Sequence, residues 1–393
     1  MSDIHCKKGS SLMKLSNTRK INERFSHFME QRQLNQRIGL GISGPASTDE
    51  IVFDDYANLK KYARHFQQTM QHQGITYSED ESVIAMMINS IAAQQLNLPE
   101  GELPFPAILI DDIIRESCVF HRGCFDENAY LKNIHFEDQS LGHFQLTHDS
   151  FAKYETVMYT VPVSKHKGIM IPRIGTFDHR FHYPCIKEDG QTWMSVTPNE
   201  ILTMEKPIAD AHGNVLTLGC GMGYYAYMVS EKETVEHITI VEKEPAVIEL
   251  FKTYILPQFS HKDKVSIVQS DAFEYMNTLE DGNFDYCFAD IWIGNNDTIP
   301  YLKLKSICKK FKQMTMSYWI EDSLVATMMG FVYILILREY YKNNHISAPE
   351  LTGLPEEEAF KLHYLDNLLK DVEIRYPDQI DYYLDYKNIL NLI

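Results

Sequence analysis

The sequence has no excess of basic residues, because 37 Lys and Arg stand against 54 Asp and Glu and give a formal net charge of −17. Binding to nucleic-acid phosphates depends on positive charge, so we expect no bulk nucleic-acid binding. The 7 cysteines, at positions 6, 118, 124, 185, 220, 287 and 308, form no CxxC pair. This pattern indicates neither a disulfide framework nor a zinc knuckle, and it favours a reducing interior.

Long apolar segments are also lacking. The longest run, Ser323–Leu337, lies between charged residues and is shorter than the roughly 20 apolar residues that a membrane span needs. The first twenty residues are polar and basic, without the apolar core of a secretion signal. We therefore predict a cytoplasmic protein that does not bind a membrane.

Local patterns divide the 393 residues into four segments. Residues 1–150 show helical spacing of apolar positions, above all in Arg19–Ile38, Asp49–Gln73 and Glu81–Leu96, and predict a helical N-terminal domain. Residues 151–198 contain short β-branched and aromatic stretches between turn residues, which predict a small antiparallel β unit. Residues 346–393 predict an acidic helical extension.

The remaining segment, residues 199–345, alternates short apolar strands with helices. The predicted strands are Val215–Leu218, His237–Val241, Val265–Gln269, Tyr286–Ala289 and Thr315–Ile320. This alternation predicts an α/β fold with a parallel, Rossmann-like sheet that is covered on both faces. Ligands of such sheets bind outside the carboxyl ends of the strands.

A glycine-rich loop follows the first of these strands. Gly219, Gly221 and Gly223 let the backbone turn tightly and approach a ligand closely, and the helix that follows offers unpaired N–H groups. A glycine string also serves as an ordinary turn, so by itself it leaves both interpretations open.

Three acids end the next three strands. Glu242 follows the last glycine by about twenty residues, where an acid accepts hydrogen bonds from ribose hydroxyls. Asp271 and Asp290 end the following two strands and point to the same crevice. Each acid alone also fits a helix cap, but four strand-end features in register favour a ligand site.

The spacing of the loop narrows the class of ligand. A Walker loop is excluded because no Gly-Lys-Ser/Thr follows, and Tyr224 stands where a dinucleotide fingerprint counted from Gly219 needs a glycine. Counted from Gly221 the fingerprint would end at Ala226, which the looser pattern tolerates. The pattern therefore favours a single nucleoside with a modest charged tail over a dinucleotide.

Four segments taken together resemble the class I S-adenosylmethionine-dependent methyltransferases. They are Val215–Gly223, Ile240–Glu244, Gln269–Phe273 and Phe284–Asp290. Their spacing, and the β unit that runs through the Asp189-Gly190 turn into a helix, look most like the spermidine-synthase-like branch. The resemblance covers roughly residues 150 to 320 and is more specific for the fold and the cofactor than for the substrate.

The resemblance implies a role for each motif. Gly219, Gly221 and Gly223 would pass under the methionine part of S-adenosylmethionine, the implied cofactor. Glu242 would hold the ribose, with Glu244 a lesser participant. Asp271 and the backbone of Ala272 would recognise adenine. Asp290 would lie beside the sulfonium as the catalytic residue, either as a base or as an acid that orients the substrate.

Three departures from the aminopropyltransferases decide the expected reaction. The stretch Asp290–Asn295 lacks their second Asp before a Pro, Trp193 stands near the position of their Gln, and Thr203–Glu205 lacks the Tyr of their Tyr-x-Glu element. We therefore expect methyl transfer to a small molecule. The alternatives are a spermidine-synthase-like aminopropyl transfer, or a nucleoside-binding scaffold without turnover.

Other motifs predict no further chemistry. His179 and His182 would face opposite sides of a strand, so we expect no metal site there. Asp111 and Asp112, with Arg115 and Glu116, resemble a metal-dependent prenyl-transfer motif, but no second acid cluster accompanies them, and a solvated helix face explains them. A homodimer remains possible. The antiparallel strand pair that usually ends a class I sheet is not evident, because Ser323–Asn343 resembles one helix; the last strands would otherwise lie near Asp371–Arg375.

Overall fold

The computed structural model describes residues 13–42, 70–71, 74–99, 102, 104–125, 127–165, 169–347 and 354–393. Contacts within the chain define two compact units. One unit comprises residues 32–291 and 310–319, and the other comprises residues 1–31, 292–309 and 320–393. The predicted helix Asp49–Gln73 lies outside the described residues except for Met70 and Gln71. The division into four segments stays a prediction.

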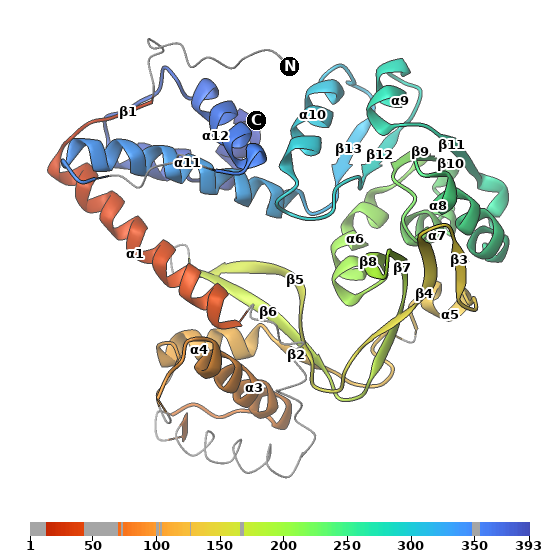
Figure 1. The fold of residues 1–393 in the computed structure, drawn as a ribbon, viewed down its shortest axis with the longest axis horizontal. Helices are drawn as coiled ribbons and strands as arrows, with labels where there is room; N and C mark the ends of the chain where they lie inside the picture. Colours follow the sequence, from red (N-terminus) through yellow and green to blue (C-terminus); the bar gives the residue numbers. More distant parts are fainter. Residues whose placement is uncertain are drawn as a thin grey trace. The chain divides into compact units, whose positions relative to one another are not determined.

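The larger unit contains a five-stranded parallel sheet (Figure 1). Its strands, in spatial order, are β11 (Val265–Gln269), β10 (Val235–Glu242), β9 (Gly213–Leu218), β12 (Tyr286–Ala289) and β13 (Thr315–Tyr318). The chain therefore runs outward from β9 to β11 and then returns to the other side of β9 for β12 and β13. This order is that of a Rossmann-like fold, and it places a topological switch point between β9 and β12. The predicted fold class is confirmed.

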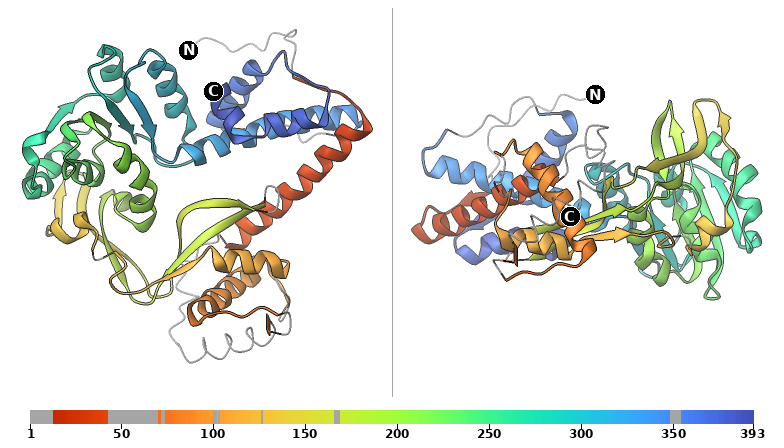
Figure 2. Two further views of the ribbon diagram at one scale, coloured as in Figure 1. Left: turned by 180° about the vertical axis from the view of Figure 1, so that it is seen from behind. Right: turned by 90° about the horizontal axis from the view of Figure 1, so that it is seen from below.

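Helix α6 (Pro198–Asp210) precedes β9, and α7 (Tyr224–Ser230), α8 (Pro245–Leu250) and α9 (Ala272–Thr278) connect the strands from β9 to β12. Helix α8 continues as one π-helical turn over Phe251–Ile255. Figure 2 shows the same sheet and helices from behind. Residues in the middle of β9 and β12 are fully buried, as expected for strands that are covered on both faces.

Two small sheets precede the parallel sheet in the chain. One contains β3 (Gln139–Leu141), β4 (Phe144–Phe151), β7 (Phe181–Glu188) and β8 (Gln191–Ser195), all antiparallel. The other contains β2 (Cys118–Phe120), β6 (Ile169–Phe177) and β5 (Thr156–Lys165). The strands of these two sheets begin at Cys118, earlier than the predicted β unit at residues 151–198, and β4 and β7 were not predicted as separate strands. Aromatic side chains join these sheets, as in the stacked rings of Phe177 and Phe181, 4.5 Å apart.

Helices cover the start of this unit. They are the second half of α1 (Arg19–Ile42), α3 (Glu79–Gln95), α4 (Ala107–Arg115) and the short α5 (Ala129–Asn133). The predicted helices Arg19–Ile38 and Glu81–Leu96 are confirmed. Buried isoleucines of α1, α3 and α4 share one apolar core with Ile171 and Ile174 of β6.

The smaller unit is mainly helical. Its elements are the first half of α1, α10 (Thr298–Cys308), α11 (Glu321–Asn343), α12 (Glu356–Leu368), α13 (Pro377–Tyr383), α14 (Tyr386–Leu392), and β1 (Lys14–Leu15), which pairs in parallel with β14 (Glu373–Ile374). The segment Asp371–Arg375 therefore does contain a strand, but it pairs with β1. Among the described residues, β13 is the last strand of the parallel sheet.

Helix α11 is the one described helix that is long and apolar enough to cross a membrane by length and composition alone. The helix also carries the core of its unit, because Leu324, Val325, Met328, Leu335 and Ile336 are fully buried. On its C-terminal half, Tyr333 and Tyr340 pack against Phe25 of α1, with ring centroids 5.6 and 5.1 Å from that of Phe25. This burial is typical of a core helix.

Candidate functional site

The three glycines of the loop have left-handed backbones but different surroundings. A Cβ on Gly219 (φ +98°) would lie 2.2 Å from the carbonyl oxygen of Asp290, and one on Gly223 (φ +71°) would lie 2.3 Å from the ring of Phe251. A Cβ on Gly221 (φ +50°) would meet nothing within 4 Å. The fold itself therefore requires Gly219 and Gly223. Gly221 alone leaves open space in front of the backbone, where a ligand can approach.

Glu242 lies at the carboxyl end of β10 and is 6% exposed. Its Oε2 accepts a hydrogen bond from Cys220 N of the glycine loop (3.0 Å), and its Oε1 accepts from Lys243 N and Glu244 N (2.8 and 2.9 Å). These bonds fix the carboxylate beside the loop. Glu244 has a different task, because it caps α8 by accepting from Ala246 N (3.2 Å).

Asp271 is the N-cap of α9. Its Oδ1 accepts hydrogen bonds from Phe273 N and Glu274 N (2.8 and 3.2 Å), and Ala272 is the first residue of the helix. Within the described chain, Oδ2 of Asp271 has no hydrogen-bond partner. Asp271 therefore caps the helix with Oδ1, one of the two interpretations that the sequence left open. Its Oδ2 remains available as an acceptor at the end of β11.

Asp290 follows β12 at the switch point. Its backbone N donates to Leu218 O (2.9 Å), and its carbonyl oxygen lies against Gly219, so the residue has a fixed place beside the glycine loop. The carboxyl group is partly buried and accepts no hydrogen bond from the described residues. Burial, and to a smaller extent the negative charge of Glu200, raise the pKa of Asp290 to about 8.

Glu200, which the sequence analysis missed, is the other carboxyl group of this region. Its oxygens accept hydrogen bonds from Ser195 Oγ (2.9 and 3.0 Å), Thr197 N (2.7 Å) and Thr197 Oγ1 (3.1 Å). Thr197 and Glu200 form the capping box of α6. Burial raises the pKa of Glu200 to about 7, although these hydrogen bonds lower it. The Thr-x-x-Glu spacing in the sequence indicates a helix cap. No sequence pattern indicates that the charge of Glu200 raises the pKa of Asp290.

Helix α5 supports the glycine loop from outside. The buried Tyr130 donates from its hydroxyl to Met222 O (2.5 Å), and Asn128 donates to the hydroxyl of Tyr224 (3.1 Å). Burial raises the pKa of Tyr130, so its hydroxyl stays protonated. Tyr130 and Met222 are 92 positions apart in the chain, and for that reason no local pattern could predict this support.

The structure shows the contacts of Trp193 and Thr203, two of the positions at which the sequence differs from the aminopropyltransferases. Trp193 of β8 packs against Phe144, with ring centroids 5.2 Å apart. Thr203 of α6 accepts a hydrogen bond from the indole nitrogen of Trp319 (3.0 Å), whose backbone N donates to Ala289 O (2.9 Å). Trp319 thus joins α6 to the ends of β12 and β13 next to Asp290.

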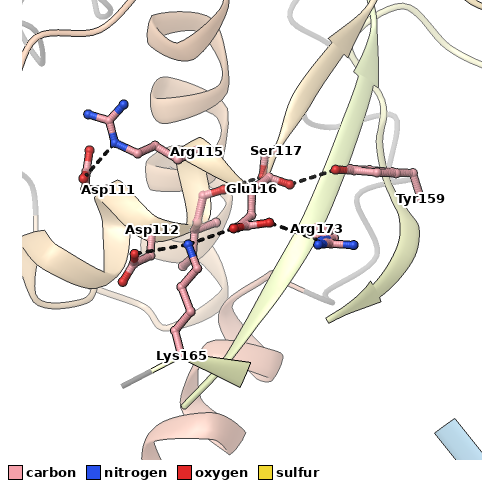
Figure 3. A network of polar contacts seen from close by, with 9 residues as sticks. Asp111, Asp112, Arg115, Glu116, Ser117, Tyr159, Lys165 and Arg173 are labelled. Carbon is pink, nitrogen blue, oxygen red and sulfur yellow. Dashed lines mark hydrogen bonds and ion pairs between the residues drawn. The ribbon is translucent and has the colours of Figure 1, made fainter. Parts of the chain in front are cut away.

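The acids Asp111 and Asp112 take part in ion pairs away from the glycine loop (Figure 3). Asp111 pairs with Arg115 (3.0 Å), Asp112 with Lys165 (3.6 Å), and Glu116 with both Lys165 (2.7 Å) and Arg173 (3.2 Å). These pairs join α4 to β5 and β6. Among the described residues, no group of three His, Cys, Asp or Glu side chains is arranged to hold a metal ion.

The parallel sheet with its glycine loop at the switch point and an acid ending the second strand is a class I S-adenosylmethionine-dependent methyltransferase-like fold, as the resemblance implied. Residues 201–333 match the spermine/spermidine synthase domain family. The predicted spermidine-synthase-like branch is thereby confirmed.

One curated relative agrees with this match. A polyamine aminopropyltransferase from Ruegeria sp. (strain TM1040) is 31% identical over 153 residues, which are 36% of this chain and 52% of that protein. The chain thus spans about half the length of this curated relative. Solved structures similar to this chain include spermidine synthase from Thermotoga maritima (18% identical, 35% of this chain and 52% of that chain, TM-score 0.26). Another is a spermidine synthase in complex with the transition-state analogue AdoDATO (17% identical, 42% and 59%, TM-score 0.28).

These comparisons correct two expectations. The preference for methyl transfer is wrong, because the matched domain is that of spermine and spermidine synthases and the curated relative is an aminopropyltransferase. S-Adenosylmethionine as a cofactor is wrong for the same reason, since that family uses the decarboxylated compound as a substrate. The departures at Trp193, Thr203 and Asp290–Asn295 therefore do not identify the transferred group.

Proposed function

We propose that this protein is an aminopropyltransferase, which moves the aminopropyl group of decarboxylated S-adenosylmethionine to an amine. One observation carries the proposal. The match to the spermine/spermidine synthase domain covers the glycine loop, Glu242, Asp271 and Asp290, all within residues 201–333.

The charges around the site support a cationic donor. Glu242, Asp271, Asp290 and Glu200 are all acids, and none of the residues assigned to the site above is basic. S-Adenosylmethionine carries a carboxylate that would lack a cationic partner among these residues, whereas its decarboxylated form carries only positive charges on the sulfonium and the amino group. Opposite charges at short range in a partly buried site favour the second compound.

Each motif has a role in this proposal. Glu242 accepts the ribose hydroxyls, because its carboxylate is fixed at the end of β10 with acceptor capacity remaining. Asp271 accepts from the adenine amino group through Oδ2, next to the backbone of Ala272. The open space before Gly221 admits the sulfonium and its tail, while Gly219 and Gly223 keep the loop in place.

The chemical step is an in-line displacement. The acceptor nitrogen forms a bond to the aminopropyl carbon as the carbon–sulfur bond breaks, and the electron pair of that bond neutralises the sulfonium. The products are the extended amine and methylthioadenosine. The attacking nitrogen must lose a proton, and Asp290, at the end of β12 with no hydrogen-bond partner in the described chain, accepts it.

The test begins with two ligands that differ in the carboxylate-bearing tail. Calorimetric titration is expected to show tighter binding of methylthioadenosine than of S-adenosylhomocysteine.

Glu242→Gln is expected to weaken methylthioadenosine binding by about tenfold, because one charged acceptor is lost. Glu236→Gln, an exposed acid at the opposite end of the same strand, is the matched control and is expected to bind normally. Preference for S-adenosylhomocysteine would contradict the proposed donor.

The transfer itself is tested with decarboxylated S-adenosylmethionine and a panel of primary amines. Formation of methylthioadenosine only when an amine is present supports the proposal, and Asp290→Asn is expected to lower kcat by at least a hundredfold. Binding of methylthioadenosine with no transfer to any amine would favour the nucleoside-binding scaffold instead.

We extend the proposal to the location and the assembly of the protein, which we propose to be a cytoplasmic homodimer. Cell fractionation tests the location, and sedimentation velocity tests the dimer.

A further inference from the structure

Asp290 and Trp319 follow one register pair at the carboxyl ends of two neighbouring strands, β12 and β13. That pair is Ala289 and Tyr318. The ladder continues past the pair, because Trp319 N donates to Ala289 O (2.9 Å) and, on the other side, Asp290 N donates to a carbonyl of β9 (2.9 Å). Residues in register on parallel strands present their side chains on the same face of the sheet. The indole of Trp319 and the carboxyl group of Asp290 therefore share one face.

Helix α6 covers this face and holds the indole ring in place. Trp319 Nε1 donates to Thr203 Oγ1 (3.0 Å) in α6, and Thr203 Oγ1 donates in turn to Asn199 O (2.7 Å). The ring therefore has a fixed orientation, and its N–H group is already bonded. Trp319 and Asp290 are both half-buried, whereas Ala289 at the end of β12 is fully buried. What Trp319 offers to a ligand beside Asp290 is thus the face of an aromatic ring.

The acids of this region leave one charge of a diamine unmatched. A diamine that presents one nitrogen to Asp290 for reaction still carries a positive charge on the other nitrogen. Asp290 is the only acid within residues 290–295, and Glu200 is already bonded to Thr197 in the capping box of α6. The π face of a tryptophan attracts an ammonium group, most strongly where water is partly excluded. Of the groups placed on this face, Trp319 is the one that offers such a π surface.

We propose that Trp319 is a specificity-determining residue, whose indole ring binds an ammonium group of the acceptor while another nitrogen of the acceptor reacts beside Asp290. This inference rests on the proposed function and deepens it, since it adds a residue that the glycine loop and the strand-end acids do not include. Thr203 is a positioning residue in this arrangement, because it fixes the ring and acts on the acceptor only through Trp319.

The direct test is amine binding to the protein–methylthioadenosine complex, which needs no turnover. Putrescine and n-butylamine have the same carbon chain and differ by one ammonium group, and both are titrated calorimetrically. Trp319→Leu is expected to weaken putrescine binding by about tenfold, because a partly desolvated cation–π contact is lost. Butylamine binding is expected to weaken only slightly, since leucine keeps an apolar contact. Trp319→Phe keeps an aromatic face and is expected to lie between wild type and Trp319→Leu.

Trp193→Leu is the matched control. Trp193 is also half-buried, but its ring packs against Phe144 (5.2 Å) in a different sheet, so this variant is expected to bind both amines as the wild type does.

The positioning residue is tested by a pair of variants. Thr203→Val has nearly the same shape as the wild type but cannot accept the hydrogen bond of the indole, and it is expected to weaken putrescine binding severalfold. Thr203→Ser keeps the hydroxyl and is expected to restore the affinity. In the transfer assay, Trp319→Leu is expected to raise KM for putrescine and to change kcat little, because Asp290 is untouched.

Equal losses of putrescine and butylamine affinity in Trp319→Leu, or no loss of either, would overturn the inference even if the protein transfers aminopropyl groups. A selective loss of putrescine binding without any transfer activity would leave Trp319 as an amine-binding residue and reject the proposed function. A wild-type complex that binds neither amine would overturn both. Methylthioadenosine binding shows that each variant is folded, and if Trp319→Leu fails this check, the same comparison of the two amines is made with Thr203→Val.

Discussion

At the scale of single residues, the structure separates glycines that the fold requires, Gly219 and Gly223, from Gly221, which leaves open space before the loop. Motif and spacing were sufficient to locate Gly219, Glu242 and Asp290, because strand ends of a parallel sheet meet at one edge. Glu200 and Tyr130 were missed. Each acts on the site from another element, and the contact between distant segments leaves no local pattern in the sequence.

The glycines of the loop give a prediction at this scale. Gly223→Ala is expected to destabilise the protein by about 2–4 kcal/mol, because the new methyl group meets the ring of Phe251 and the backbone is left-handed. Gly221→Ala meets only the backbone cost of about 1 kcal/mol. Urea denaturation measures both variants.

Methylthioadenosine binding separates the effect on the ligand from the effect on stability. Gly221→Ala is expected to lose little stability but much of its affinity for methylthioadenosine. The methyl group of Gly221→Ala occupies the open space before the loop, so this variant is expected to bind at least tenfold more weakly while remaining folded. Normal binding by folded Gly221→Ala would mean that the ligand does not approach the loop there.

At the scale of elements, short apolar runs that alternate with helices predicted the five parallel strands to within a few residues. It failed for β4 and β7, where aromatic and polar residues are mixed and no clear period of two appears. It also did not find the pairing of β14 with β1, since a two-residue strand carries almost no pattern.

A histidine between three elements gives a pH-dependent prediction. His121, just after β2, lies 2.8 Å through Nδ1 from Asp178 in the β6–β7 turn and 3.0 Å through Nε2 from Asp80 in the first turn of α3. Asp178 also pairs with His179 (2.7 Å). Two carboxylates accept on both sides, so the ring must be protonated to donate to both. The hydrogen bond to Asp178 and then the one to Asp80 raise the pKa of His121.

Because the pKa of His121 is higher in the folded protein, its contribution to stability is complete below the ordinary histidine pKa of about 6.5. It is lost as pH rises through the raised value. Hydrogen exchange in the first turn of α3 is therefore expected to accelerate, relative to the intrinsic rate, as the pH rises above the ordinary histidine pKa of about 6.5. His121→Gln should remove this pH dependence, and His143→Gln, another exposed histidine paired with a single acid, should retain it. Since His121 is exposed, the effect on global stability is small.

At the scale of the whole molecule, the sequence indicated an α/β protein with helical segments, and it could not show which segments pack together. The smaller unit joins residues 1–31, 292–309 and 320–393, three stretches that lie far apart in the chain. Local periodicity reports which face of an element is apolar. It does not report which partner covers that face, as the packing of Phe25 on Tyr333 illustrates.

The net charge of −17 gives the last prediction, because it belongs to the molecule and not to any site. A strongly negative protein raises the local concentration of a cationic amine, and salt screens this attraction over a distance of about 10 Å at 0.1 M. The value of kcat/KM for a polyamine acceptor is therefore expected to fall severalfold between 0.02 and 0.5 M NaCl, as judged from that screening length. Methylthioadenosine is uncharged, so its binding constant is the internal control and should change little. A kcat/KM that is independent of salt would mean that the acceptor is recognised by short-range contacts alone, with no contribution from the electrostatic field of the whole protein.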